Sequence, residues 1–465
     1  MSRREENLNH SDQKGLYRTL AVVALPIALQ SLIGSSLNLV DNLMVGSLGE
    51  AELNAVGVSV QIYFIHWMVM FGFTSGSSTF MAQFFGAKDL HNIRKTAGFA
   101  ITVAMSVSIL FFTAAMFFPH YVLRIFTRFP EVIDLGVGYV RMAAPAFLFV
   151  AINVPLTAAL RATQQTKLPL YISGVAFLTN TFLNYLFIFG SLGAPKLGVT
   201  GAALATMIAR AIEMSLTLIV IFGRKNLIGG RLREFFDFDK EFAVKIIKNA
   251  IPTTINETMW GLGTALYIAA FARIGVTEGA AVQACNTINN LFMMAAFSVG
   301  DATLILVGQK LGEGKLEYAY YLAKKLVRIS LIIGICAGSG LILCGKPLLS
   351  LFDFTQTGAE YAFWILVVYG CTMWMGIYNA TNITGVLRCG GDTRYAMLAE
   401  VLAVWCIGVP TAFLTALVLK WPIYFAVLAV RLEDVAKGIA LTRRFFSKKW
   451  VKNVIRDISG NDTAN

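Results

Sequence analysis

The chain has 465 residues, of which 56% are hydrophobic and 14% charged, with a mean hydropathy of +0.65 and a net charge of +12. A soluble globular protein of this size is excluded, because so few charged residues could not cover so much apolar side-chain area. Uncharged runs long enough to cross about 30 Å of hydrocarbon, about 20 helical residues each, predict a polytopic helical membrane protein.

Twelve membrane-spanning helices are predicted, and the last is the weakest because it contains four charged residues. In chain order they cover 17–44, 53–82, 96–119, 138–160, 168–190, 198–222, 249–272, 279–308, 326–346, 359–386, 395–418 and 421–442. The expected fold is an all-α polytopic membrane protein in which twelve transmembrane helices form two pseudo-symmetric six-helix bundles. Its parts are an N-terminal tail (1–16), a first bundle (17–222), a linker (223–248), a second bundle (249–442) and a C-terminal tail (443–465).

Lysine and arginine are unevenly distributed between the two sets of loops. Of the 39, 29 fall in the two tails and in the loops on the same side as the tails, seven fall in the opposite loops, and three lie within spans. By the positive-inside rule both termini are therefore cytoplasmic. The net charge follows from this bias and from attraction to anionic membrane lipid, so it does not indicate a nucleic-acid partner.

The two halves of the chain repeat each other. At an offset of 226 residues, Pro26 aligns with Pro252, Gln83 with Gln309 and Gly86 with Gly312, without a gap. One residue further in offset, LRATQQTK (160–167) aligns with LRCGGDTR (387–394). Six spans in each half give both halves the same orientation in the membrane, as in transporters built from parallel repeats.

Several stretches resemble the multidrug and toxic compound extrusion (MATE) family. They are VDNLMVGSLGEAELNAVGV (40–58), AQFFGAKDLHNIRK (82–95), LGVTGAALAT (197–206) and LRCGGDTR (387–394). The resemblance implies two six-helix bundles, alternating access, and export of amphipathic cationic drugs in exchange for H⁺ or Na⁺. We also expect a monomer in a bacterial plasma membrane, with no cofactor beyond the coupling ion.

The resemblance assigns polar residues one by one, and this chain departs from the pattern. Asp41 matches an aspartate of span one and Asn180 an asparagine of span five, but the aspartate expected four residues later is Asn184. Thr206 lies in the stretch that resembles the start of span six. In another branch of the family the acids lie in spans seven and ten, where this chain has Glu257, about one turn early, and only Asn379 and Asn382. The coupling ion and the bundle that binds it therefore stay open.

Charged residues within the spans fall into two groups, because an ionised group among apolar helices costs several kcal/mol unless it is paired or hydrated. Arg210–Glu213 and Arg431–Asp434 have i,i+3 spacing, and Glu433–Lys437 has i,i+4 spacing, so we expect structural ion pairs. By contrast, the acids Asp41, Glu257, Asp301 and Glu400 have no basic residue within four positions.

These isolated acids are candidates for cation or proton coupling, except Glu400, for which a hydrated helix end is expected. The repeat aligns Asp41 with Tyr267 and Glu257 with Ser31. The shared fold therefore requires neither carboxylate, and each predicted bundle carries one acid of its own. This asymmetry favours binding or coupling over packing.

Aromatic and thioether side chains could line an adaptable apolar cavity for cationic drugs. The candidates are Tyr63, Trp67, Trp260, Tyr267, Met293, Met294 and Trp374.

Two other functions fit the sequence less well. A lipid-linked oligosaccharide flippase would need free Arg or Lys in its cavity, whereas Arg210, Arg431 and Lys437 all have nearby acids. An integral membrane transferase would need an acidic Mg²⁺ motif or a histidine cluster, and the sequence shows neither, nor any other metal-ligand spacing. Without a Walker A motif, ATP is not expected to drive transport directly.

Overall fold

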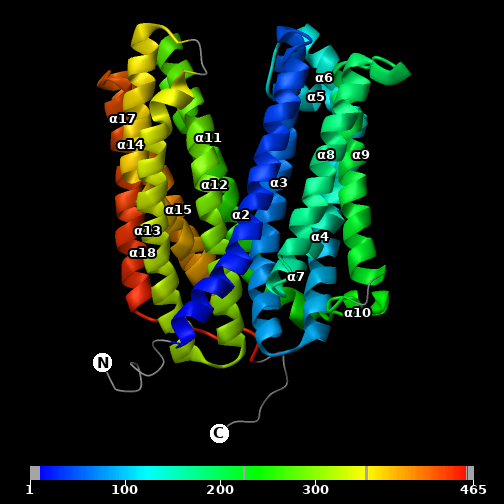
Figure 1. The fold of residues 1–465 in the computed structure, drawn as a ribbon, viewed down its shortest axis with the longest axis vertical. Coiled ribbons are helices and arrows are strands. Elements are labelled where there is room, and N and C mark those ends of the chain that lie inside the picture. The colour runs from blue at the N-terminus through cyan, green and yellow to red at the C-terminus, as the bar shows by residue number, and fades with distance from the viewer. Residues whose placement is uncertain (1–10, 224–225, 351–353, 457, 459–465) are drawn as a thin grey trace. The chain divides into compact units, whose positions relative to one another are not determined.

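The computed structural model describes residues 11–223, 226–350, 354–456 and 458. Most of the predicted N-terminal tail and the end of the C-terminal tail lie outside these residues. Within them the chain forms helices and no strands (Figure 1). The helices are α2 (Ser11–Gly46), α3 (Glu50–Gly86), α4 (Leu90–Phe117), α5 (Pro119–Arg124), α6 (Pro130–Ala143), α7 (Pro145–Ala162), α8 (Lys167–Phe189), α9 (Val199–Leu218), α10 (Leu232–Phe235), α11 (Lys240–Ala272), α12 (Val276–Gly312), α13 (Leu316–Leu349), α14 (Gln356–Ala380), α15 (Thr393–Ala403), α16 (Val409–Phe413), α17 (Ile423–Val430) and α18 (Leu432–Phe446). Three short π-helical segments continue these helices: Thr381–Leu387 follows α14, Val404–Gly408 lies between α15 and α16, and Leu414–Val418 follows α16.

Ten of the helical stretches in the described chain are long and apolar enough to cross a membrane. The two remaining predicted spans correspond to α11, which begins with charged residues, and to α17 with α18, which carries the charges already noted in the sequence. The predicted all-α fold with twelve transmembrane helices is confirmed. One difference is local: the expected loop before the fourth span contains α5 and the start of α6, each opened by a proline at its first turn.

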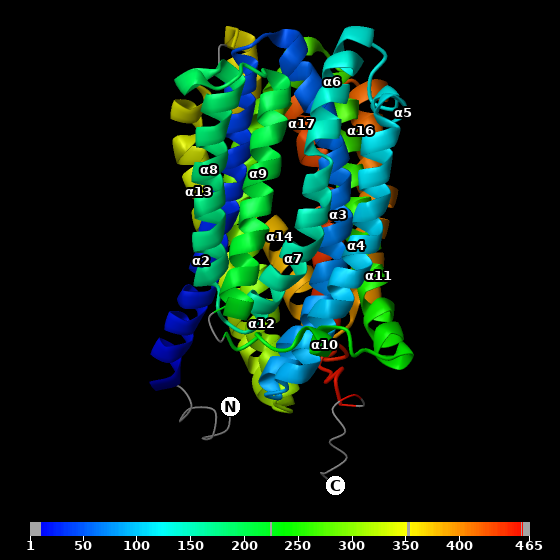
Figure 2. The ribbon, with the colours of Figure 1, turned by 90° about the vertical axis from the view of Figure 1, so that its right-hand side faces the viewer.

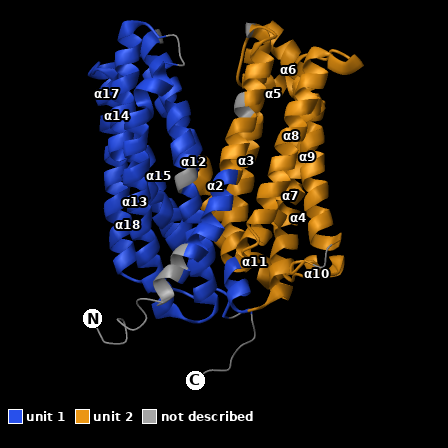
Figure 3. Cartoon of the chain, viewed as in Figure 1, with its two compact units in different colours: residues 1–29, 82–87, 259–465 blue, residues 30–81, 88–258 orange. Residues whose placement is uncertain are grey.

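The chain divides into two compact units (Figure 3). Unit 1 comprises residues 1–29, 82–87 and 259–465, and unit 2 comprises residues 30–81 and 88–258. The units therefore differ from the predicted bundles, because α2 and α11 are each shared between them. Both helices contain a proline shortly before the point of division, Pro26 in α2 and Pro252 in α11.

Unit 2 is built from the second part of α2, most of α3, helices α4 to α10 and the first part of α11. Its core includes Val45, Ile62, Phe147 and Ile188, from α2, α3, α7 and α8. The first part of α11 packs closely on α3, since a Cβ at Gly72 would overlap the Thr254 backbone. Thr253 Oγ1 donates to Gly72 O at 2.7 Å, which fixes the register of this contact.

Unit 1 contains the first part of α2 and the last six residues of the α3 region. Leu20, Val23 and Ile27 of α2 belong to a core that also contains Leu304 and Trp450. Residues after Phe446, expected as tail, return to this core, and Trp450 is completely buried. The amide of Gln83 fixes this segment: its Nε2 donates to Cys389 O at 2.7 Å, and its Oε1 accepts from Val454 N at 2.8 Å.

The sequence repeat reappears as a reciprocal contact within unit 1. A Cβ at Gly86 would overlap Gln309 O, and a Cβ at Gly312 would overlap Gln83 O. These are the residues that the 226-residue offset aligns with each other. Glycine at both positions therefore allows α3 and α12 to approach through equivalent surfaces, as expected for duplicated halves.

Candidate functional site

A chain of hydrogen bonds joins α2, α8 and α9 in unit 2. Asn184 Nδ2 donates to the Asp41 carboxylate and, at 3.1 Å, to Asn180 Oδ1. Asn180 Nδ2 in turn donates to Thr206 Oγ1 at 3.3 Å. Four residues predicted as site residues therefore lie in one cluster, which we call the Asp41 cluster.

The α8–α9 hairpin positions three members of the Asp41 cluster. The two helices lie side by side in both views (Figures 1 and 2). Gly190 turns the chain at the end of α8 with φ of 72°, and Leu197 N donates to Phe187 O at 2.8 Å. A Cβ at Gly201 would overlap the Phe187 carbonyl, so glycine permits the close approach of the two helices. Asn180 and Thr206 can then bond across the hairpin.

The Asp41 cluster contains acceptors that no cation or further donor among the described residues satisfies. Asp41 is partly exposed, whereas Asn180 and Asn184 are 1% and 0% exposed. Pointing its amide nitrogen at the carboxylate leaves Asn184 Oδ1 buried without a hydrogen-bond partner. Such an orphaned acceptor is costly unless something donates to it. A proton-carrying or cationic group that contacts both residues would neutralise the Asp41 carboxylate and satisfy Asn184 Oδ1.

A second polar network lies further along the same helices of unit 2. Arg210 Nη1 donates to Glu213 Oε2 at 2.7 Å, which is the ion pair expected from the spacing. Glu213 Oε1 also accepts from Ser173 Oγ at 3.0 Å, and Ser173 Oγ accepts from Gln30 Nε2 at 2.9 Å. Gln30 Oε1 accepts from Arg161 Nη2 at 2.6 Å. Sequence patterns do not predict Gln30, Ser173 or Arg161 as site residues, because their partners are far away in the chain.

Unit 1 contains a more highly charged network around α18. Arg431 Nη1 lies 3.3 Å from Asp434 Oδ2, and Lys437 Nζ lies 3.1 Å from Asp434 Oδ1 and 3.3 Å from Glu433 Oε1. The Tyr267 hydroxyl donates to Glu433. Both carboxylates and Lys437 are at most 5% exposed. All three charge pairs expected from helical spacing are therefore present.

Two neighbouring residues of this network were predicted as pocket residues. Asn379 Nδ2 donates to the Asp434 backbone oxygen at 2.9 Å, so this asparagine supports the start of α18. The repeat aligns Tyr267 with Asp41, but the two side chains bond differently: the Tyr267 hydroxyl donates to Glu433, whereas Asp41 accepts from the Asn184 amide. Gly408 allows this bond, since a Cβ there would overlap both the Tyr267 hydroxyl and Glu433.

The other predicted coupling residues lie on different helices. Glu257 is on α11, is 8% exposed, and falls in unit 2 together with Asp41. The first part of α11 packs in unit 2, so the compact units place both acids together although the repeat assigns them to different halves. Asp301 is on α12 in unit 1 and is partly buried.

The candidate cavity residues are divided between the units. Tyr63 and Trp67 lie in unit 2, and Tyr63 stacks on Phe147 with ring centroids 4.4 Å apart. Trp67 and Trp374 are 45% and 39% exposed. The members in unit 1 are Trp260, Met293, Met294, Trp374 and the buried Asn382.

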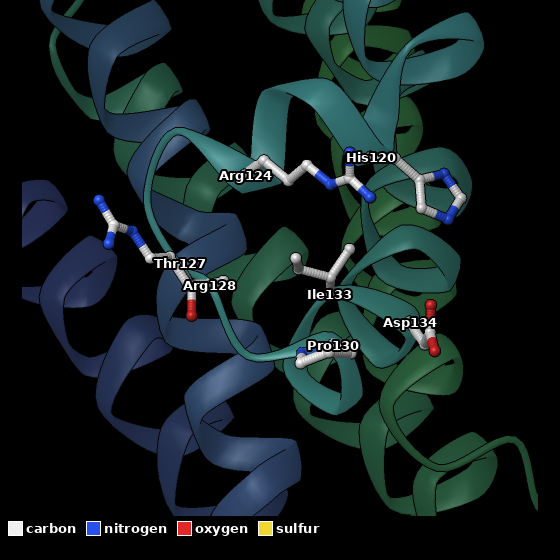
Figure 4. A pocket seen from close by; sticks show the side chains of 7 residues that line it. All are labelled: His120, Arg124, Thr127, Arg128, Pro130, Ile133 and Asp134. Carbon is white, nitrogen blue, oxygen red and sulfur yellow. The ribbon is translucent and has the colours of Figure 1, made fainter.

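A pocket of about 360 Å³ lies elsewhere in unit 2, between α5 and the start of α6 (Figure 4). Its lining consists of His120, Arg124, Thr127, Arg128, Pro130, Ile133 and Asp134, none of which was predicted as a site residue. Among the residues that the structure describes, no group of three His, Cys, Asp or Glu side chains could hold a metal ion.

The linker after α9 also docks on unit 2. Arg94 Nη1 lies 2.7 Å from Glu234 Oε2, and Arg94 Nη2 donates to Gly229 O at 2.8 Å. The Arg231 backbone N–H and the Arg94 guanidinium lower the pKa of Glu234 below its usual value. The linker thus covers the start of α4, near Arg94 and Gly98.

Comparison with known proteins gives a consistent result. The sequence profile of the family described as MatE matches residues 26–186 and 252–414. The chain is 26% identical over 407 residues to a probable multidrug resistance protein, YoeA of Bacillus subtilis, covering 86% of each chain. It is 24% identical over 445 residues to a probable multidrug resistance protein, NorM of Thermotoga maritima, covering 94% of each.

Solved structures share the fold at low sequence identity. A MATE protein in complex with MaL6 superposes with a TM-score of 0.85 at 16% identity, covering 93% of this chain and 97% of the other. An outward-facing multidrug resistance MATE family transporter of the MOP superfamily gives a TM-score of 0.83, also at 16% identity, with coverages of 93% and 96%.

Proposed function

The chain belongs to the MatE family, and on this premise we propose that it exports amphipathic organic cations in exchange for H⁺ or Na⁺. It acts as a monomeric secondary transporter by alternating access, without a cofactor and without chemical conversion of its substrate. It lies in a bacterial plasma membrane with both termini in the cytoplasm, in keeping with the distribution of lysine and arginine. The multidrug resistance names of its relatives support export of drugs.

The Asp41 cluster is the single observation that carries this proposal. Asp41 is a partly exposed carboxylate within a membrane-spanning helix, and the group that donates to it, the Asn184 amide, is neutral. A carboxylate in this setting binds a proton, a metal cation or an organic cation, and these compete because each neutralises the same charge. Binding of the ion when the site faces outward would then release the drug.

The energy available to a single site is sufficient for coupling. Moving one charge through the full membrane potential is worth about 2.3 kcal/mol per 100 mV. Each unit of pH difference adds about 1.4 kcal/mol for a titrating group. Exchange of one monovalent ion for one monovalent drug cation at this carboxylate moves no net charge, so the potential acts equally on both. The ion gradient then drives the exchange, by about tenfold in drug concentration for each unit of pH difference.

The remaining candidates take supporting roles in this proposal. Glu257 and Asp301 contribute to cation or proton exchange. The aromatic and thioether side chains Tyr63, Trp67, Trp260, Met293, Met294 and Trp374 provide apolar contacts, and aromatic faces also attract organic cations.

Efflux from proteoliposomes with pH and Na⁺ gradients imposed separately tests the proposal. We expect one gradient to drive efflux of a monovalent cationic dye such as ethidium. Asp41→Asn should reach the membrane in normal amounts and lose nearly all gradient-driven efflux, because the amide can neither titrate nor neutralise a cation. Gradient-driven efflux at the wild-type rate, with an unchanged pH profile, in Asp41→Asn would remove Asp41 from the mechanism.

A further inference from the structure

Arg210 lies where it could serve either of two carboxylates in unit 2. It is one helical turn after Thr206 on α9, and Thr206 belongs to the Asp41 cluster. Its guanidinium bonds Glu213 at 2.7 Å, and it also attracts Asp41 electrostatically. A flexible arginine side chain, 37% exposed here, can change partner without movement of the backbone.

Glu213 is fixed by a network that does not involve Arg210. Its Oε1 accepts from Ser173 on α8, and Ser173 is bonded to Gln30 on α2. The Glu213 side chain is only 9% exposed. A carboxylate needed only to neutralise Arg210 on its own helix would not require a hydrogen bond from Ser173, which Gln30 of α2 holds in turn. The network instead orients Glu213 so that its second oxygen receives the guanidinium.

The charged and titratable groups around Asp41 come from three other helices. Arg210 is on α9, and Tyr139 on α6 also interacts electrostatically with Asp41. Tyr63 on α3 interacts with both Tyr139 and Arg210, and its buried hydroxyl has no hydrogen-bond partner. Helix α8 contributes neutral amides. Among these groups, Arg210 is the one that brings a positive charge to Asp41.

We propose that Glu213 is a positioning residue for transport: it holds Arg210 on its own carboxylate and so leaves the Asp41 carboxylate open to a proton or a cationic drug. The inference rests on the proposed function of Asp41. With Glu213 in place, the two carboxylates and one guanidinium carry one net negative charge. Without the Glu213 charge, Arg210 pairs with Asp41, the net charge becomes zero, and cations lose their attraction to the site.

Glu213→Gln tests this role in proteoliposomes, with ethidium as the transported cation. We expect normal amounts of folded protein, a rise of about tenfold or more in KM, and a pH of half-maximal efflux lower by about one unit. The double variant Glu213→Gln/Arg210→Gln should restore both values, because Asp41 again has no competing cation. A purely structural ion pair would lower the amount of folded protein without moving the pH profile.

Two further variants keep the test decisive. Ser173→Ala retains every charge but frees one oxygen of Glu213, so we expect a shift in the same direction, about threefold in KM. It reports on the proposal even where Glu213→Gln fails to fold. Asp434→Asn breaks the matched i,i+3 pair of unit 1 and should leave the pH profile of the folded protein unchanged.

The outcomes separate the two proposals. Wild-type KM and pH profile in both Glu213→Gln and Ser173→Ala would overturn the role of Glu213, even with Asp41→Asn inactive. Failure of the double variant to restore the pH profile would also overturn it. Normal efflux by Asp41→Asn would instead refute the proposed function itself.

Discussion

The polar clusters of the two units differ in how their carboxylates are satisfied. In unit 1, Glu433 and Asp434 both accept bonds from Lys437, and Asp434 also pairs with Arg431. In unit 2, Asp41 accepts from the neutral amide of Asn184, while Arg210 is bonded to Glu213. Burial is also unequal, because the unit 1 carboxylates are 5% exposed and Asp41 is partly exposed.

This difference separates a scaffold from a binding site. Carboxylates that contact lysine and arginine directly are already neutralised, and removing one partner leaves a buried charge. A carboxylate bonded to an amide keeps its charge available for a ligand. Glu400 on α15 adds to the attraction on Lys437, so the unit 1 network extends beyond α18.

Lys437→Met should have the largest effect, on folding. Lys437 is 4% exposed and bonds two carboxylates that are buried with it, so its loss leaves excess negative charge in an apolar interior. We expect a loss of about 3–5 kcal/mol in stability. The amount of monodisperse detergent-solubilised protein and its thermal midpoint measure this. A triple variant that also carries Glu433→Gln and Asp434→Asn should recover part of the loss, and an unchanged midpoint in Lys437→Met would contradict the scaffold assignment.

Arg431→Ala should be less damaging, because Asp434 retains Lys437. Arg431 also stacks on the Tyr369 ring at 4.9 Å, and this contact would be lost. We expect about 1–3 kcal/mol lower stability and less folded protein, with Asp434→Asn milder still. Efflux per folded molecule should stay near wild type in both variants. Normal accumulation of Arg431→Ala together with abolished efflux would mean that the charged network of unit 1 acts in transport and does not only support the fold.

Sequence alone located the spans well where charge or turn residues bound an apolar run. The span predicted at 168–190 is α8, Lys167–Phe189, since a lysine precedes it and Gly190 turns the chain after it. The C-terminal end of unit 1 was less predictable. The segment that follows the buried Trp450 is bonded to Gln83, from the other half of the chain, and nothing in the residues around Trp450 indicates that partner.

The same distinction applies to the site. Ion pairs such as Arg210–Glu213 follow from helical spacing alone. The bond between Tyr267 and Glu433 joins residues 166 positions apart, and no local pattern encodes it. The division of α2 and α11 between units was missed for a related reason. Hydropathy gives the length of a helix but not the neighbours that each of its ends contacts.

Glu257→Gln tests whether unit 2 contains a second coupling carboxylate. Glu257 is 8% exposed within α11 and lies in the same unit as Asp41. We expect normal folding and a fall of about tenfold, or about 1.4 kcal/mol, in gradient-driven ethidium efflux, because glutamine can neither exchange a proton nor neutralise a cation. Counterflow without a gradient should be retained. If gradient-driven efflux is unaffected, Asp41 is the coupling acid of unit 2 without help from Glu257.

Asn180→Ala should have the smallest effect, and its size reports how the Asp41 cluster is organised. Asn180 does not bond Asp41; it accepts from Asn184 and donates to Thr206. Alanine therefore leaves the Asn184–Asp41 bond in place but removes the acceptor that fixes the second hydrogen of the Asn184 amide. One neutral hydrogen bond is worth about 1 kcal/mol, so we expect drug resistance and efflux to fall about threefold to fivefold, in the direction of Asp41→Asn.

Thr206→Val is the matched control, because it keeps the Asn184–Asn180 bond and should lose less. Minimal inhibitory concentrations and ethidium KM measure both variants. A loss in Asn180→Ala as complete as that in Asp41→Asn would mean that Asn180 contacts the transported cation itself, and the carboxylate would then not be the sole ligand that unit 2 supplies.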